Sequence, residues 1–148
     1  MCSVGEEVWD YRWWRDVLQT AAPCSECGRA LAPGDELVYQ ATYVADGDDE
    51  GDPRHTYRCC QHCERLSDWL SDQCGGFVFG QVLEDVRDHV LDRDYIDDNQ
   101  VEIPFWEKLS LARHVTHALK QWRRPDGTLR PVPPHLCDRS SETEIPPP

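Results

Sequence analysis

Two pairs of cysteines with identical internal spacing constrain this chain more than any other feature of its sequence. Each pair has the form Cys-x-x-Cys, and 32 residues separate the pairs, whose members are Cys24, Cys27, Cys60 and Cys63. Two thiolates separated by two residues can bind one metal ion from a tight turn, and four sulfur ligands suit a closed tetrahedral Zn²⁺ site. We therefore predict one structural zinc ion bound by these four residues.

The identity of the ligands has alternatives. Cys59 could replace Cys60, and His62 could complete a set of three cysteines and one histidine. We favour Cys60 because, together with Cys63, it repeats the spacing of the first pair. Two matched pairs are too ordered to favour either a redox motif or cysteines scattered through a core.

The total cysteine content bears on the compartment. The chain contains eight cysteines, and an even number can indicate a disulfide framework in a short secreted protein. The first residues, however, lack the basic and apolar stretches of a signal peptide, so we expect reduced thiols and a location in the bacterial cytoplasm. The sequence also has no apolar run long enough to cross a membrane as a helix.

The segment that holds the cysteines, residues 23–73, is predicted to form a small zinc module. Residues 36–44 have the composition of a strand, residues 46–52 form an acidic turn, and a return strand begins at residues 54–57. The second cysteine pair opens a helix, whose N-terminus favours thiolate charge. A knuckle, a β-hairpin and a helix in this order are typical of a treble-clef zinc finger.

An aromatic helix is predicted in residues 1–22, before the zinc module. Trp9 and Trp13 are four residues apart, with Trp14 and Leu18 beside them, which gives an aromatic stripe on one face of a helix. These rings could stack on bases or contact a partner, but packing against the core is the simpler interpretation.

Two or three further helices are predicted after the module, in residues 74–124, which makes the fold α+β. One runs from 81 to 92 and another from 104 to 124. The apolar face of the last helix is predicted to consist of Phe105, Leu109, Ala112, Val115, Leu119 and Trp122. Residues 125–148 hold seven of the eleven prolines and are predicted to form an extended tail.

Charge is distributed unevenly along the chain. There are 15 Lys and Arg against 28 Asp and Glu, a net charge of −13, which repels nucleic-acid phosphates unless a local basic patch offsets it. Residues 81–107 carry a net charge of −7, whereas residues 108–124 carry +5 with no acid. The candidate partner-binding residues in these two blocks are Asp92, Asp94, Asp97, Asp98, Arg113, Lys120 and Arg124.

A resemblance to a known group of proteins rests on three stretches of the sequence. These are Pro-Cys-Ser-Glu-Cys-Gly-Arg-Ala-Leu-Ala-Pro-Gly-Asp-Glu, then Tyr-Arg-Cys-Cys-Gln-His-Cys-Glu-Arg-Leu, then Gly-Gly-Phe-Val-Phe-Gly-Gln-Val-Leu-Glu-Asp-Val-Arg-Asp-His. Together, from about Pro23 to His89, they resemble small treble-clef proteins of bacteriophage and prophage genomes. The resemblance implies the finger fold, a phage origin and the same four cysteine ligands, but no activity.

These observations predict a binding protein rather than an enzyme. The sequence contains no nucleophile elbow, phosphate-binding glycine loop or His-Glu metalloprotease pattern. We expect a phage-type, zinc-stabilised protein that binds a host or phage protein. In the more specific form of this prediction, the protein is an acidic mimic of nucleic acid that inhibits a host defence complex, like an anti-CRISPR protein. The alternative is a DNA- or RNA-binding regulator that uses the basic helix of residues 108–124.

Overall fold

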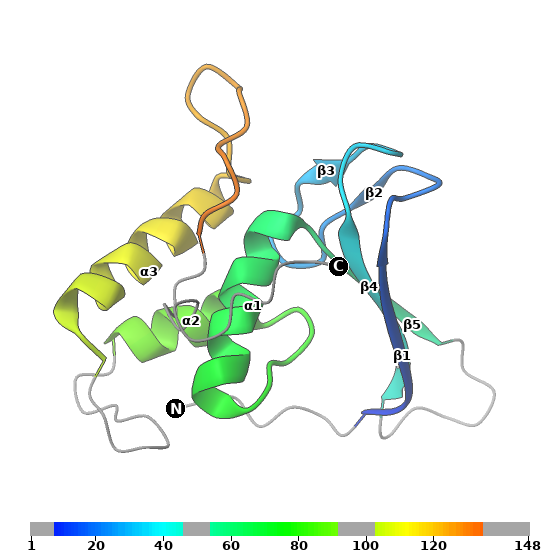
Figure 1. Ribbon diagram of the computed structural model, residues 1–148, viewed down its shortest axis with the longest axis horizontal. Coiled ribbons are helices and arrows are strands. Elements are labelled where there is room, and N and C mark those ends of the chain that lie inside the picture. Colours follow the sequence, from blue (N-terminus) through cyan, green and yellow to red (C-terminus); the bar gives the residue numbers. More distant parts are fainter. Residues whose placement is uncertain (1–7, 46–53, 92–102, 135–148) are drawn as a thin grey trace, which may run out of the picture.

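The computed structural model describes residues 8–45, 54–91 and 103–134, and it has an α+β fold (Figure 1). Within those residues three helices accompany a three-stranded antiparallel sheet and a two-stranded hairpin. In chain order the elements are β1 Val8–Asp16, β2 Ala22–Pro23, β3 Ala30–Leu31, β4 Val38–Ala45, β5 His55–Cys59, α1 Gln61–Cys74, α2 Val82–Leu91 and α3 Phe105–Leu119.

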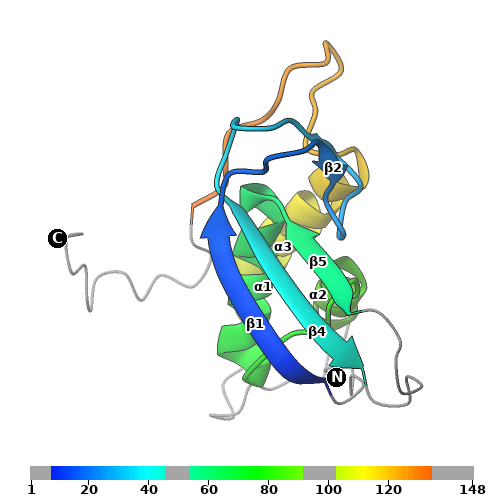
Figure 2. The same ribbon diagram turned by 90° about the vertical axis from the view of Figure 1, so that its right-hand side faces the viewer.

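The three-stranded sheet has the order β1-β4-β5, and both pairs of neighbours are antiparallel (Figure 2). In β4, which is rich in aromatic and β-branched residues, Tyr39 lies opposite Cys59 and Ala41 opposite Tyr57 of β5. Because successive side chains alternate between the faces of a strand, these residues share one face. All four are buried, so this is the core side of the sheet.

The predicted N-terminal helix is wrong, because residues 8–16 form the strand β1. Its residues pair with β4 in a register that places Trp13 opposite Ala41 and Arg15 opposite Tyr39. The segment is dense in aromatic residues, which favour strands, and β4 offers it an edge to pair with. The helical spacing of the tryptophans was therefore coincidental, and the strand pairs regularly with β4 from Arg12 to Asp16, beyond a bulge between Trp9 and Arg12.

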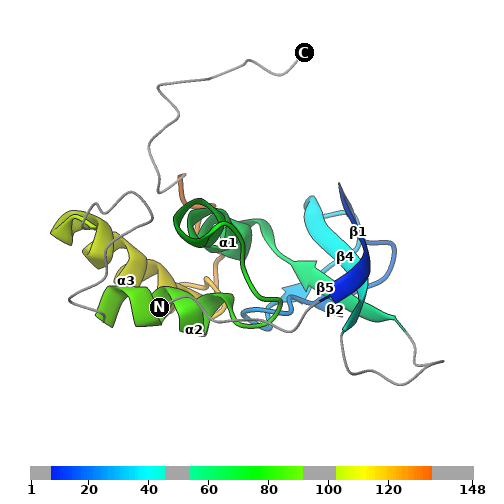
Figure 3. The ribbon, with the colours of Figure 1, turned by 90° about the horizontal axis from the view of Figure 1, so that it is seen from below.

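The core lies between the sheet and α1, whose buried residues include Leu66, Trp69 and Leu70. Phe77 and Phe79, from the loop after α1, pack their rings against Tyr57 of the sheet at centroid distances of 6.1 Å and 4.5 Å. Helix α1 ends at Gly75, which has a φ of 77° and serves as a left-handed cap. Helix α1 lies between the sheet and α3 (Figures 1 and 3).

Helix α3 is shorter than predicted, and it buries a different face. Its buried residues are Leu111, Val115 and Ala118, whereas Phe105 and Leu109, which were predicted to face the core, are 74% and 52% exposed. Both sets fit helical spacing, so the sequence pattern alone could not choose between them. Of the other two residues predicted on that face, Leu119 is exposed and Trp122 is buried.

The chain leaves the helix after Leu119 and turns sharply. Gln121 and Trp122 have positive φ values of 58° and 60°, and this turn brings the Trp122 ring into the core. Residues 123–130 then fold back through an isolated bridge between Arg123 and Leu129. The first part of the predicted extended tail is therefore a turn, and the Arg130 carbonyl oxygen accepts a hydrogen bond from His62 of α1 at 2.6 Å, whereas residues 135–148 lie outside the described part of the chain.

Candidate metal centre

The first cysteine pair lies in a tight knuckle between β2 and β3. The Cys24 amide donates to the carbonyl oxygen of Arg29 at 2.9 Å, and the Gly28 amide donates to that of Cys24 at 3.0 Å. Gly28 has a φ of 77°, a conformation that glycine adopts without strain. The knuckle is joined to β5, because the Ser25 amide donates to the Arg58 carbonyl at 2.6 Å.

The second pair opens helix α1, as predicted. Cys60 is the N-cap residue, and its sulfur accepts a hydrogen bond from the Cys63 amide at 3.4 Å. Cys63 lies in the first turn, where the helix dipole favours negative charge. Both sulfurs are therefore held where unpaired amide groups stabilise thiolates.

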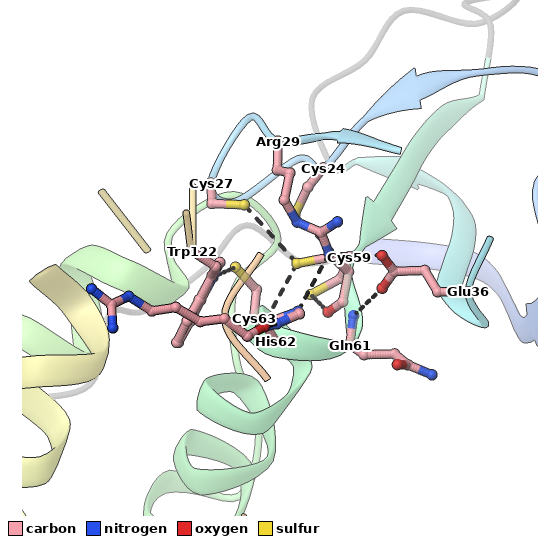
Figure 4. A network of polar contacts seen from close by, with 11 residues as sticks. Cys24, Cys27, Arg29, Glu36, Cys59, Gln61, His62, Cys63 and Trp122 are labelled. Atoms are coloured by element: carbon pink, nitrogen blue, oxygen red, sulfur yellow. Dashed lines mark hydrogen bonds and ion pairs between the residues drawn. The ribbon is translucent and has the colours of Figure 1, made fainter. Parts of the chain in front are cut away.

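The structure brings the four predicted cysteines together (Figure 4). Their Sγ atoms lie within 4.8 Å of one another, and those of Cys27 and Cys60 are 4.0 Å apart. A tetrahedral zinc ion with four Zn–S bonds of about 2.3 Å separates its sulfurs by about 3.8 Å, so the cluster has the dimensions of such a site. Cys24, Cys60 and Cys63 are buried and Cys27 is half-buried, which gives a closed site.

The two alternative ligands point elsewhere. The Cys59 sulfur is buried but donates toward the carbonyl oxygen of Cys60, outside the cluster. Nδ1 of His62 lies 3.4 Å from an Arg29 nitrogen that can only donate, so Nδ1 accepts there. Its Nε2 then carries the proton and donates to the Arg130 carbonyl at 2.6 Å. Both nitrogens of His62 are engaged within the protein.

Hydrogen-bond donors surround the sulfurs. The amides of Glu26 and Cys60 each approach the Cys24 sulfur at 3.4 Å, and the indole Nε1–H of Trp122 donates to the Cys63 sulfur at the same distance. Such contacts orient metal ligands and stabilise their charge. Sequence reasoning placed Trp122 on a helix face, and no local pattern indicated that a turn would bring it to the cluster.

The thiols influence one another strongly. The pKa of Cys24 lies far below its usual range, because its thiolate accepts a hydrogen bond from the Cys27 thiol and further ones from the other cysteines. The pKa values of Cys60 and Cys63 are raised, chiefly by their contact with Cys24. A thiolate at Cys24 therefore disfavours the ionisation of Cys60 and Cys63. Binding of a divalent cation to all four sulfurs must then release protons.

Glu26, inside the first Cys-x-x-Cys motif, connects the knuckle to the helical region. Its carboxylate accepts hydrogen bonds from the Tyr57 hydroxyl at 2.5 Å and from the amides of Gly80 and Val82 at 2.8 Å and 3.0 Å. These amides lie at the start of α2, where a carboxylate also complements the helix dipole. Burial nevertheless raises the pKa of Glu26. No pattern in the sequence indicated this contact.

Arg29 and Glu36 form a second connection across the module. The Arg29 guanidinium is almost fully buried and donates to the Glu36 carboxylate at 2.7 Å. The other oxygen of Glu36 accepts from the Gln61 amide at 3.1 Å, in the first turn of α1. These contacts thus connect the knuckle, the segment just before β4 and the helix that carries the second cysteine pair.

The candidate partner-binding residues lie away from this cluster or outside the description. Arg113, Lys120 and Arg124 are exposed, on α3 and the turn that follows it. The pKa of His117, between them, is lowered first by burial and then by nearby positive charges that include those of Arg130, Arg113 and Lys120. Asp92, Asp94, Asp97 and Asp98 fall outside the described residues, as does the acidic turn.

No protein-family model matches the chain, and no curated protein or solved structure matches it either. Among the described residues, no helix is both long enough and apolar enough to cross a membrane. The chemistry of the cysteine cluster therefore carries the functional argument.

Proposed function

We propose that this chain is a zinc-stabilised binding module of the treble-clef type, in which one Zn²⁺ ion, held by Cys24, Cys27, Cys60 and Cys63, has a structural role. The single observation that carries the proposal is the convergence of four cysteine sulfurs, from a knuckle and a helix N-terminus, within 4.8 Å of one another. Thiolate ligands in a set of four are typical of structural zinc.

The surroundings of the cluster favour a structural role over a catalytic one. All four ligand positions of a tetrahedron are supplied by the protein, so no coordination position is left for water or substrate. The amide and indole groups around the sulfurs are already used to donate hydrogen bonds to them. The residues present would hold the ion and shield it, and the ion would supply folding energy.

A role in protein binding is the remaining part of the proposal. A small domain fixed by zinc offers a rigid surface, and the chain carries a large excess of acid. An acidic surface attracts basic, nucleic-acid-handling proteins of a bacterial host, and a phage-encoded inhibitor of a defence complex is the specific form that we propose.

Nucleic-acid contact is the second candidate, and the environment of His117 favours it. Three cationic side chains from α3 and the chain after it, Arg113, Lys120 and Arg130, act on that side chain, which places positive charge at one end of the helix. Arg113, Lys120 and Arg124 would contact phosphates.

Affinity capture of the zinc-loaded full chain from a bacterial lysate separates the two candidates, with bound protein and nucleic acid identified separately. Recovery of a nucleic-acid-handling protein without nucleic acid supports the inhibitor role, and addition of the chain should then compete with that protein's nucleic acid. Recovery of DNA or RNA that is released by salt, and that is lost in Arg113→Glu, would support the second candidate. If folded, zinc-loaded protein recovers neither such a protein nor nucleic acid, both candidates are overturned.

A further inference from the structure

The strand β1 lies at an open edge of the sheet. In the order β1-β4-β5, β1 pairs with β4 on one side, and no described strand pairs with its other side (Figure 2). The opposite edge of the sheet is covered, because the knuckle and Arg58 of β5 exchange two hydrogen bonds: the Ser25 amide donates to the Arg58 carbonyl, and the Arg58 amide donates to Ser25 Oγ. Only one of the two edges is therefore available for pairing within the described chain.

The side chains of β1 expose aromatic surface along this edge, and beyond a bulge between Trp9 and Arg12 the strand pairs regularly with β4 as far as Asp16. The strand contains no proline, glycine or lysine, and its aromatic residues Tyr11, Trp13 and Trp14 are 41%, 52% and 41% exposed. Proteins normally shorten or disrupt such edges, because unpaired backbone groups beside apolar side chains recruit other strands. An edge of this kind indicates an interface.

We propose that β1 pairs antiparallel with β1 of a second copy of this chain, around a two-fold axis at Trp14, so that the two sheets become continuous. Arg12 then lies opposite the partner's Asp16, and this pair occurs twice. Trp13 lies opposite the partner's Arg15, and within one copy the Arg15 guanidinium already lies over the Trp13 ring at 5.2 Å. Opposite charges and cation–aromatic contacts across a pair both stabilise strand association.

Symmetry and charge select this register. A two-fold axis perpendicular to the sheet keeps each side chain on its own face, so the axis must pass through a residue rather than between two. An axis at Arg12 or Arg15 would place that arginine opposite its own copy, and an axis at Asp16 would place two aspartates opposite one another. Like charges directly opposite are destabilising. Within the regularly paired stretch from Arg12 to Asp16, only the axis at Trp14 places an acid opposite a base.

The residues that specify the register are suitably placed. Arg12 and Asp16 are exposed and, with Trp14, occupy the same face of β1. The Asp16 carboxylate accepts a hydrogen bond from its neighbouring Val17 amide at 2.7 Å, which orients it locally. On the other face, Arg15 is fixed by a 2.6 Å hydrogen bond from its Nε to Glu64 of α1.

The test uses zinc-loaded full chain in sedimentation experiments at about 0.15 M salt, where charges more than about 8 Å apart are largely screened. The wild-type chain should dimerise with increasing concentration. The variants Arg12→Asp and Asp16→Arg should each raise the dissociation constant about tenfold or more, because each places like charges opposite one another twice. An equimolar mixture of the two variants should dimerise again, because every such pair is then opposite in charge.

Two controls keep the outcome specific. Arg113→Asp makes the same charge change on an exposed position of α3 and should leave the dimer unchanged. Circular dichroism checks that each variant is folded. If a charge variant fails to fold, Trp14→Thr takes its place: threonine favours strands, and loss of the Trp14 ring should weaken the dimer. A wild-type chain that stays monomeric at all concentrations would overturn the proposal, as would a dimer that the β1 variants do not weaken or a mixture that does not restore it.

Discussion

The metal module and helix α3 are held in the molecule by different kinds of interaction. The module is fixed by directional contacts: four sulfurs at one point, amide donors around them, and the buried pair of Arg29 and Glu36. Helix α3 is held mainly by a stripe of three buried apolar residues, and its large apolar side chains outside that stripe are exposed. The two regions meet where the Trp122 indole reaches the Cys63 sulfur. The module should therefore depend on its metal, and α3 on packing.

Removal of the metal should have the largest effect. Structural zinc contributes on the order of 10 kcal/mol to folding in small domains, so a strong chelator should melt the module and release α3 with it. Circular dichroism and the summed fluorescence of the six tryptophans would follow the loss. A spectrum that is unchanged after confirmed metal loss would contradict the proposed dependence.

A substitution in the buried stripe of α3 should come next. Leu111→Ala leaves a cavity and should lower the free energy of unfolding by about 2–5 kcal/mol. The matched control Leu109→Ala, on the exposed side of the helix, should change it by about 0.5 kcal/mol or less. Chemical denaturation of zinc-loaded protein measures both. Equal effects would contradict packing through the Leu111 face, and a larger loss in Leu109→Ala would mean that α3 packs through the face predicted from sequence.

The Glu26 contact, which joins the module to the start of α2, should have an intermediate effect. Glu26→Ala leaves the Tyr57 hydroxyl and the amides of Gly80 and Val82 without their acceptor, which should cost about 1–3 kcal/mol. Thermal unfolding measures the loss. Glu84→Ala, which removes an exposed carboxylate from the same region, should be close to neutral, and a comparable loss in that variant would contradict a specific role for Glu26.

The indole contact should give the smallest of these effects. Trp122→Phe keeps most of the buried ring but removes the donor to the Cys63 sulfur, so stability should fall by about 1 kcal/mol and zinc affinity should weaken. Competition with a chelating dye measures that affinity. Trp106→Phe, at a side chain that is 63% exposed, is the control and should leave it unchanged.

The sequence predicted the parts of the fold that depend on local spacing. The two Cys-x-x-Cys pairs, the strands β4 and β5, and the helix that begins at Cys60 all follow from short patterns whose geometry is nearly fixed. The spacing also favoured Cys60 over Cys59, and the four clustered sulfurs are those of the predicted set.

The remainder depended on contacts between distant segments. Residues 8–16 fit a helical stripe, but pairing with β4 makes them a strand. Helix α3 carries two apolar stripes, and packing against α2 and α1 decides which one is buried. A sharp turn brings Trp122 to the cluster. Glu26 accepts hydrogen bonds from amides at the start of α2, and Arg29 forms a buried ion pair with Glu36. None of these leaves a periodic signal in the sequence.

The most direct test of the central claim is the metal content of purified chain, measured by mass spectrometry in the wild type and in two adjacent variants. The account predicts one zinc ion per chain in the wild type and in Cys59→Ser, and loss of zinc together with the fold in Cys60→Ser, since only the Cys60 sulfur belongs to the cluster. A folded wild-type chain that neither contains nor binds zinc would contradict the account. So would a Cys60→Ser variant that keeps both its zinc and its fold.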